Sequence, residues 1–160
     1  MDTTVGIVVA NGRVLTPSQM IQRGAVWIRG ERIVGVGERV PDESGDATVI
    51  DASDLLVVPG LIDIHVHGGA GFDTMDATPE AIGGMAQFFA RHGVTSFLAT
   101  TMTAGREETL AAIANAARCQ HTGTGGAHVL GVHLEGPYIS REQPGAQPVA
   151  QIRPADPAEY

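Results

Sequence analysis

The sequence predicts an α/β protein in two parts: a small β-sandwich domain over residues 1–57, and the first three βα units of a TIM-like (β/α)₈ barrel over residues 58–160. Three observations support this fold class. Short alternating apolar runs separated by turn signals end near residue 57. Longer apolar runs then alternate with helical patterns, which is typical of a parallel sheet. The predicted strand ends follow one another at about 34 residues, close to the roughly 31 residues per unit of a ~250-residue barrel.

Two turn dipeptides organise the predicted strands of the first part. Asn11-Gly12 is typical of a type I′ hairpin turn, and Gly30-Glu31 is expected to close a second hairpin. A sandwich of about four to six short strands buries little apolar surface, so we expect it to pack against the rest of the protein. The predicted strands are Gly6–Ala10, Arg13–Leu15, Ala25–Ile28, Arg32–Val36 and Thr48–Ile50.

Three strands and two helices are predicted in the second part. The near-continuous apolar run Leu56–Val66 is expected of a strand covered on both faces. The first helix starts at Thr78-Pro79, which combine an N-cap hydroxyl with a proline at the first helical position, and it ends before Gly93. The other elements are the strands Val94–Ala99 and Val129–Leu134 and the helix Arg106–Arg118. The helices are expected to bury Ile82, Met85, Ala86 and Phe89 in the first, and Leu110, Ile113, Ala114 and Ala117 in the second.

Charge and composition are those of a soluble protein. The chain has 10 basic and 18 acidic side chains and a net charge of −8, which argues against non-specific nucleic-acid binding and a basic membrane-binding face. We expect no membrane span and no signal peptide, because no apolar stretch approaches ~18 residues and the N-terminus lacks a basic-then-apolar pattern. The single cysteine, Cys119, agrees with a cytoplasmic location, and its helical surroundings predict a buried, unreactive thiol.

Two histidines and a glutamate stand at predicted strand ends. His65 and His67 are separated by one residue, so alternation along a strand turns both imidazoles to the same face. Glu135 follows an apolar strand and precedes Gly136-Pro137, and a buried carboxylate there needs a positive partner. The strand ends are also where such barrels carry their chemistry. Together the three residues predict a site for a divalent metal such as zinc.

Other interpretations of these residues stay open. A single histidine on a strand is more often a hydrogen-bonded structural residue than a ligand. His133 shares a face with Glu135 but is expected to support the site or the core, and Asp63 is expected to be a structural or supporting carboxylate. The run Gly68–Gly71 is a poor phosphate cradle because it follows two histidines and opens no helix. The G-x-G-x-x-G fingerprint of a doubly wound dinucleotide fold is absent.

Several segments resemble the amidohydrolase superfamily. Pro59–His67 is similar to its first-strand signature, and residues 1–57 resemble the small domain that these enzymes build from both chain ends. Gly68–Ala77, Gly93–Thr100 and above all Gly131–Ile139 resemble the N-acetylglucosamine-6-phosphate deacetylase family within that superfamily. The resemblance covers essentially all 160 residues.

The resemblance implies metal-dependent deacetylation of N-acetylglucosamine 6-phosphate to glucosamine 6-phosphate and acetate, a step of amino-sugar catabolism. Glu135 matches the metal-binding glutamate of the family, and His65 and His67 match a histidine pair that some members keep. One or two divalent ions are therefore expected: zinc, iron, cadmium or another. Ala146 and Gln147 fall where the family contacts the sugar. The implied partners are the phosphorylated amino sugar and further copies in a homo-oligomer, with no nucleic acid and no membrane.

The length of the chain leads to two further expectations. Residues 58–160 hold about three of the eight units of a closed barrel, so we expect an N-terminal portion of a longer protein. Two more histidine ligands, a catalytic aspartate and the phosphate-binding groups are then expected beyond Tyr160, and the chain alone is expected to be inactive. No catalytic residue is assigned within it. The alternatives are an inactive metal-binding fragment or another amidohydrolase, such as a cyclic-amide hydrolase or a deaminase. Many of these use a modified lysine where this chain has Glu135.

Overall fold

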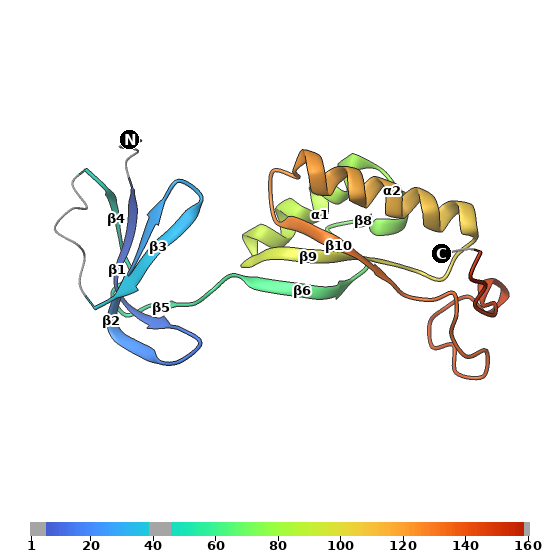
Figure 1. Ribbon diagram of the computed structural model, residues 1–160, viewed down its shortest axis with the longest axis horizontal. Helices are drawn as coiled ribbons and strands as arrows, with labels where there is room; N and C mark the ends of the chain where they lie inside the picture. The colour runs from blue at the N-terminus through green and yellow to red at the C-terminus, as the bar shows by residue number, and fades with distance from the viewer. Residues whose placement is uncertain (1–5, 39–45, 159–160) are drawn as a thin grey trace. The chain divides into compact units, whose positions relative to one another are not determined.

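The computed structural model describes residues 6–38 and 46–158. The chain divides into two compact units, Met1–Pro59 and Gly60–Tyr160, and each is described by itself (Figure 1). In the described part of the chain, no helix is both long enough and apolar enough to cross a membrane.

The first unit contains one five-stranded sheet. Its strands are β1 (Ile7–Leu15), β2 (Met20–Arg29), β3 (Arg32–Gly37), β4 (Thr48–Asp51) and β5 (Leu56–Val57). The order is β3-β2-β1-β4; β1 pairs antiparallel with β2 and parallel with β4, and β5 pairs with the other end of β1. The hairpin predicted around Gly30 is confirmed by the antiparallel pairing of β2 with β3. Since all strands of this unit within the described residues join one sheet, the second sheet of the predicted sandwich stays a prediction.

The hairpin predicted at Asn11-Gly12 is wrong, because the residues on both sides continue as the single strand β1. A type I′ turn needs two residues with positive φ, whereas here only Asn11 has one, at 67°, and the pairing with β2 shifts register beside it. Position 12 favours glycine for a different reason. A Cβ there would lie 2.7 Å from Cγ2 of Val57 in β5, which is too close. The chain reverses after Thr16, whose N–H donates to the carbonyl of Gln19 at 2.9 Å.

The second unit is built on a parallel three-stranded sheet. Its strands, β6 (Leu61–Val66), β9 (Val94–Thr101) and β10 (His128–Leu134), lie in the order β10-β9-β6. The helices α1 (Pro79–Arg91) and α2 (Arg106–Thr122) connect these strands and lie on one face of the sheet (Figure 1). The predicted alternation of strands and helices is therefore confirmed. Because the strands are parallel, their carboxyl ends meet at the same edge.

The apolar run predicted as one strand, Leu56–Val66, forms two strands, β5 and β6, one in each unit. The break falls at Pro59, whose nitrogen has no hydrogen to donate to a neighbouring strand. β6 is an edge strand, and Leu61, Ile62 and Ile64 are 60, 59 and 67% exposed. Within the described residues, the expected coverage of both faces is therefore not present.

The first helix follows its predicted signals closely. Thr78 is the N-cap, and its Oγ1 accepts a hydrogen bond from the N–H of Ala81 at 3.2 Å, while Pro79 takes the first helical position. All four residues predicted to be buried lie in the main core of the unit, against Phe97 of β9: Ile82, Met85, Ala86 and Phe89.

The second helix buries a different face from the predicted one. The apolar residues expected to be buried are exposed or only partly buried: Leu110, Ile113, Ala114 and Ala117. The buried residues are Thr109, Ala112, Asn115, Ala116 and Cys119. The polar members of this face have local partners, since Oγ1 of Thr109 donates to the carbonyl of Gly105 at 3.0 Å and Oδ1 of Asn115 accepts from Arg118 at 2.8 Å. Counting apolar residues therefore selected the wrong face.

The glycine run after His67 forms a small hairpin. β7 (Gly68–Gly69) pairs antiparallel with β8 (Phe72–Asp73), and the two residues between them, Ala70 and Gly71, both have positive φ. The short helix η2 (Thr74–Asp76) follows, with Asp73 as its N-cap. The run therefore opens no long helix, as the sequence predicts.

Cys119 is expected to be unreactive in the folded chain. The residue is 4% exposed, and burial raises the pKa of its thiol. Because the thiolate is the nucleophile, both effects slow alkylation. We expect iodoacetamide to label the native chain on the order of 100-fold more slowly than the chain unfolded in guanidinium chloride. Mass spectrometry of timed samples measures both rates, and equal rates would show that this helix face is open to solvent.

Candidate metal centre

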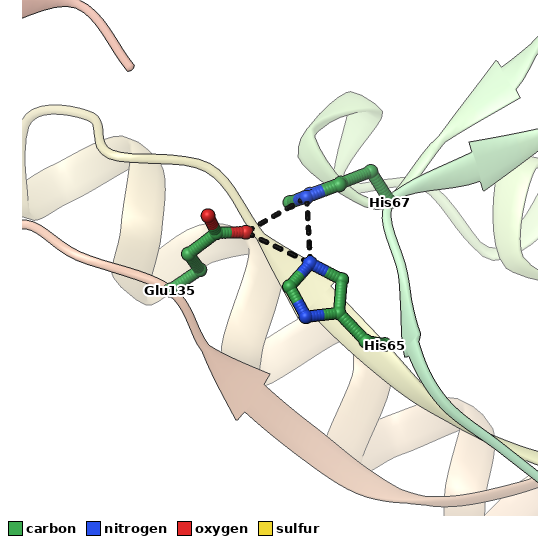
Figure 2. Close-up of side chains that lie close together, drawn as sticks. All are labelled: His65, His67 and Glu135. Carbon is green, nitrogen blue, oxygen red and sulfur yellow. Dashed lines mark hydrogen bonds and ion pairs between the residues drawn. The ribbon is translucent and has the colours of Figure 1, made fainter. Parts of the chain in front are cut away.

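The candidate site lies at the carboxyl edge of the parallel sheet, where β6 and β10 flank β9. His65 lies within β6, His67 follows that strand, and Glu135 directly follows β10. Figure 2 shows their side chains pointing at one another. The structure therefore brings together the three residues that the sequence singles out as metal ligands.

The three facing atoms form a compact triangle. Oε2 of Glu135 lies 3.0 Å from Nε2 of His65 and 2.8 Å from Nε2 of His67, and the two nitrogens are 3.3 Å apart. Zinc bonds of about 2.0–2.2 Å place neighbouring ligand atoms about 2.8–3.1 Å apart at right angles and about 3.3–3.6 Å apart at the tetrahedral angle. The observed distances fall within these ranges, so one divalent ion fits all three atoms.

The chemistry of the three atoms also suits a cation. An ionised carboxylate only accepts hydrogen bonds, and a neutral imidazole keeps a lone pair on one nitrogen. Oε2 of Glu135 is shielded from solvent and accepts no well-formed hydrogen bond within the described residues, although both imidazole nitrogens lie against it. A shielded, negatively charged oxygen is costly without a positive partner, and a cation shared by the three atoms would supply one.

Neighbouring groups hold the histidine segment in place. Oδ1 of Asp63 accepts a hydrogen bond from the N–H of His65 at 3.0 Å, and Oγ1 of Thr100 in β9 accepts one from the N–H of Val66 at 2.9 Å. The ring of His133 packs edge-on against that of His65, with centroids 4.7 Å apart and planes at 75°. Asp63 thus has the structural role that the sequence predicts. His133 contacts one candidate ligand without joining the group of three in the described residues.

Gln147 is hydrogen-bonded directly to Glu135, a contact that the sequence analysis missed. Its Nε2 donates to Oε1 of Glu135 at 2.8 Å, and its Oε1 accepts from the N–H of Thr103 at 2.8 Å. Gln147 is buried, whereas its neighbour Ala146 is exposed. The amide is oriented by its bond to Thr103, which lies 44 residues earlier in the chain, so periodicity and spacing carry no signal for this contact. The sugar contacts predicted for Ala146 and Gln147 stay predictions.

Comparisons with known proteins show what this chain is similar to. A model of the amidohydrolase family matches residues 56–159. The N-acetylglucosamine-6-phosphate deacetylase of Bacillus subtilis (strain 168) is 38% identical over 146 residues, covering 89% of this chain and 37% of that protein. The N-acetylgalactosamine-6-phosphate deacetylase of Escherichia coli O157:H7 is 47% identical over 113 residues, covering 70% of this chain and 30% of that protein.

A solved structure of a deacetylase is also similar to this chain. A variant of the N-acetyl-D-glucosamine-6-phosphate deacetylase of Mycobacterium smegmatis, in complex with N-acetyl-D-glucosamine-6-phosphate, superposes with a TM-score of 0.82 and 32% identity. The match covers 96% of this chain and 39% of that one. The chain thus spans less than two fifths of the length of these relatives. The similarities confirm the predicted α/β fold class and the resemblance carried by the motifs.

Proposed function

The chain belongs to the amidohydrolase family, and on that premise we propose that it is part of a metal-dependent deacetylase that converts N-acetylglucosamine 6-phosphate to glucosamine 6-phosphate and acetate. One observation carries the proposal: His65, His67 and Glu135 converge at the carboxyl edge of the sheet in a chain whose relatives are named as such deacetylases. Enzymes with parallel βα units place their chemistry at this edge.

Within this proposal, the two Nε2 atoms and Oε2 of Glu135 would hold a divalent ion, and zinc suits a set of two imidazoles and one carboxylate. When bound, such an ion lowers the pKa of a coordinated water toward ~7 and polarises the acetamide carbonyl. His65, His67 and Glu135 would fix the position of the ion. The carboxylate contributes negative charge, and the hydrogen bond from His65 to Asp63 fixes the strand backbone beside one imidazole.

Substrate binding would use the loop that follows Glu135. Ala146 is exposed in that loop, so its backbone and methyl group are accessible to a sugar, and Gln147 is its buried neighbour. Departure of the amine needs a proton donor. We place that donor, the remaining metal ligands and the phosphate-binding groups in the part of the relatives that this chain does not match. A reducing, cytoplasmic compartment and a homo-oligomer belong to the same proposal, and the free, buried thiol of Cys119 is compatible with the former.

A second candidate substrate is N-acetylgalactosamine 6-phosphate, because the relative with 47% identity is named for it. The two sugars differ only at the hydroxyl on carbon 4, and the metal site acts on the acetamide that they share. A cyclic-amide hydrolase is less well supported, since Glu135 stands where many of those enzymes use a modified lysine.

A chimera tests this function. The matching N-terminal segment of the B. subtilis deacetylase is replaced by this chain, and acetate release from both sugar phosphates is measured. We expect turnover on N-acetylglucosamine 6-phosphate that is lost on chelation, returns with zinc, and is at least about 100-fold lower in the Glu135→Gln chimera, because a metal centre contributes several kcal/mol of transition-state stabilisation.

The matched control for that chimera is His128→Gln at the opposite end of β10, which should keep the activity. A chimera that is folded and zinc-loaded but hydrolyses only a cyclic amide such as dihydrouracil, or neither sugar phosphate, would contradict the proposal.

A further inference from the structure

Gln147 bridges the candidate metal ligand Glu135 and the end of the neighbouring strand. The side chain is 8% exposed, and both ends of its amide are bonded: Nε2 to Oε1 of Glu135, and Oε1 to the N–H of Thr103, each at 2.8 Å. Nε2 also lies 3.8 Å from Sδ of Met102. A buried amide with both ends bonded is strongly oriented, because any rotation leaves polar groups unpaired.

The backbone of Thr103 decides which way this amide faces. A backbone N–H can only donate, so the group facing it must be the amide oxygen. The NH₂ group therefore faces Glu135, whose oxygen must accept. The direction of both hydrogen bonds thus follows from one donor that cannot reverse its role.

The two carboxylate oxygens of Glu135 therefore have different partners. Oε1 of Glu135 is taken by Gln147, while Oε2 faces His65 and His67 at 3.0 and 2.8 Å. An oxygen that already accepts a hydrogen bond from a buried amide is a poorer second ligand for an ion. Only Oε2 is therefore directed toward the two imidazoles.

Hydrogen bonds also hold the loop that carries Gln147 in place. The N–H of Gln147 donates to the carbonyl of Pro144 at 3.0 Å, and the Arg141 guanidinium donates to the carbonyl of Ile152 at 3.0 Å. Arg153 donates to the carbonyl of Ala104 at 3.0 Å, which ties the loop to the segment after β9. The amide is therefore held from its backbone as well as from its two partners.

We propose that Gln147 is a positioning residue that holds Glu135 as a single-oxygen metal ligand by binding its other oxygen. The inference rests on the metal site of the proposed function and deepens it. Partners of metal-bound carboxylates typically change metal affinity by 10–100-fold when they are removed. Gln147 acts through Glu135, so its effect appears in metal binding even where no turnover is measured.

Two substitutions test this role. Gln147→Met keeps the length of the side chain and removes both hydrogen bonds, and Gln147→Glu keeps the shape but sets a carboxylate against Oε1 of Glu135. Zinc affinity is measured by competition with a chromophoric chelator, and the geometry of the site by the visible absorption of bound Co²⁺. We expect Gln147→Met to weaken zinc binding about 10–100-fold and to change the Co²⁺ spectrum. Gln147→Glu should change the Co²⁺ spectrum as well, because a carboxylate cannot donate the hydrogen bond that now holds Oε1 of Glu135.

The matched control is Gln143→Met, at an exposed glutamine of the same loop, which should bind zinc and Co²⁺ as the unchanged chain does. Tm of each metal-free variant shows whether it is folded. If Gln147 only stabilised the loop, Gln147→Met would lower the metal-free Tm and leave zinc affinity and the Co²⁺ spectrum of the folded chain unchanged. That result would overturn the inference and leave the deacetylase proposal standing. Absence of zinc binding in the unchanged chain would overturn both.

Discussion

Replacing Glu135 by glutamine is expected to weaken zinc binding by the 160-residue chain at least about 100-fold, because one of the ligands is lost together with its charge. The substitution keeps the shape of the side chain but removes the negative charge that faces the two imidazoles at 2.8 and 3.0 Å. In the unchanged chain, the NH₂ group of Gln147 donates to Oε1 of Glu135. In the variant, the new NH₂ group at position 135 can face this NH₂ group, and two donors cannot bond to each other. Isothermal titration calorimetry, or chelator competition if binding is tight, measures the change.

His128→Gln is the matched control for that measurement. His128 is an exposed imidazole at the start of β10, the strand that Glu135 follows, so the same element is altered at its opposite end. We expect the control variant to bind zinc as the unchanged chain does. Equal affinities for the two variants would remove Glu135 from the site, whatever the convergence of the side chains indicates.

The parts of this structure that local chemistry determines were predictable from the sequence. Helix α1 begins at Pro79, directly after its N-cap Thr78, because a capping hydroxyl and a proline at the first helical position are local signals. His65 and His67 share a face because strand alternation is local, and Glu135 joins them because parallel strands end at one edge. The inferences about the site need only the strand pattern and the rule that the carboxyl ends of parallel strands meet at one edge.

The parts that depend on contacts between distant segments were not predictable. Asn11-Gly12 suits a tight turn and also a bulge, and the close approach of β5 to Gly12 favours the bulge within a continuous β1. Helix α2 turns its small and polar residues to the core, which no count of apolar positions reveals. The bond between Gln147 and Glu135 depends on a loop that folds back to Thr103. Such contacts are decided by packing, which overrides local preference.

The chain by itself is expected to show no turnover on N-acetylglucosamine 6-phosphate, even when loaded with zinc. Its described residues offer three candidate ligand atoms, and the carboxylate of Asp63 already accepts a hydrogen bond from the N–H of His65. A missing proton donor alone lowers rates by about 10²–10⁴-fold. The chain also spans 37% of the length of the B. subtilis relative, so most of that protein is not matched here.

The uncovered edge strand β6 strengthens this expectation. Leu61, Ile62 and Ile64 are more than half exposed, and an apolar strand edge favours association with other chains over a water-excluding active site.

Acetate release by the zinc-loaded chain is measured in parallel with acetate release by the chimera that contains the rest of the B. subtilis enzyme. The chimera is the active reference. Turnover by the chain alone that disappears in Glu135→Gln would contradict the prediction and place a proton donor within these 160 residues. Asp63→Asn would then be the first variant to assay, because Asp63 is the carboxylate bonded to the histidine segment. Loss of that turnover with zinc affinity unchanged would identify Asp63 as the acid.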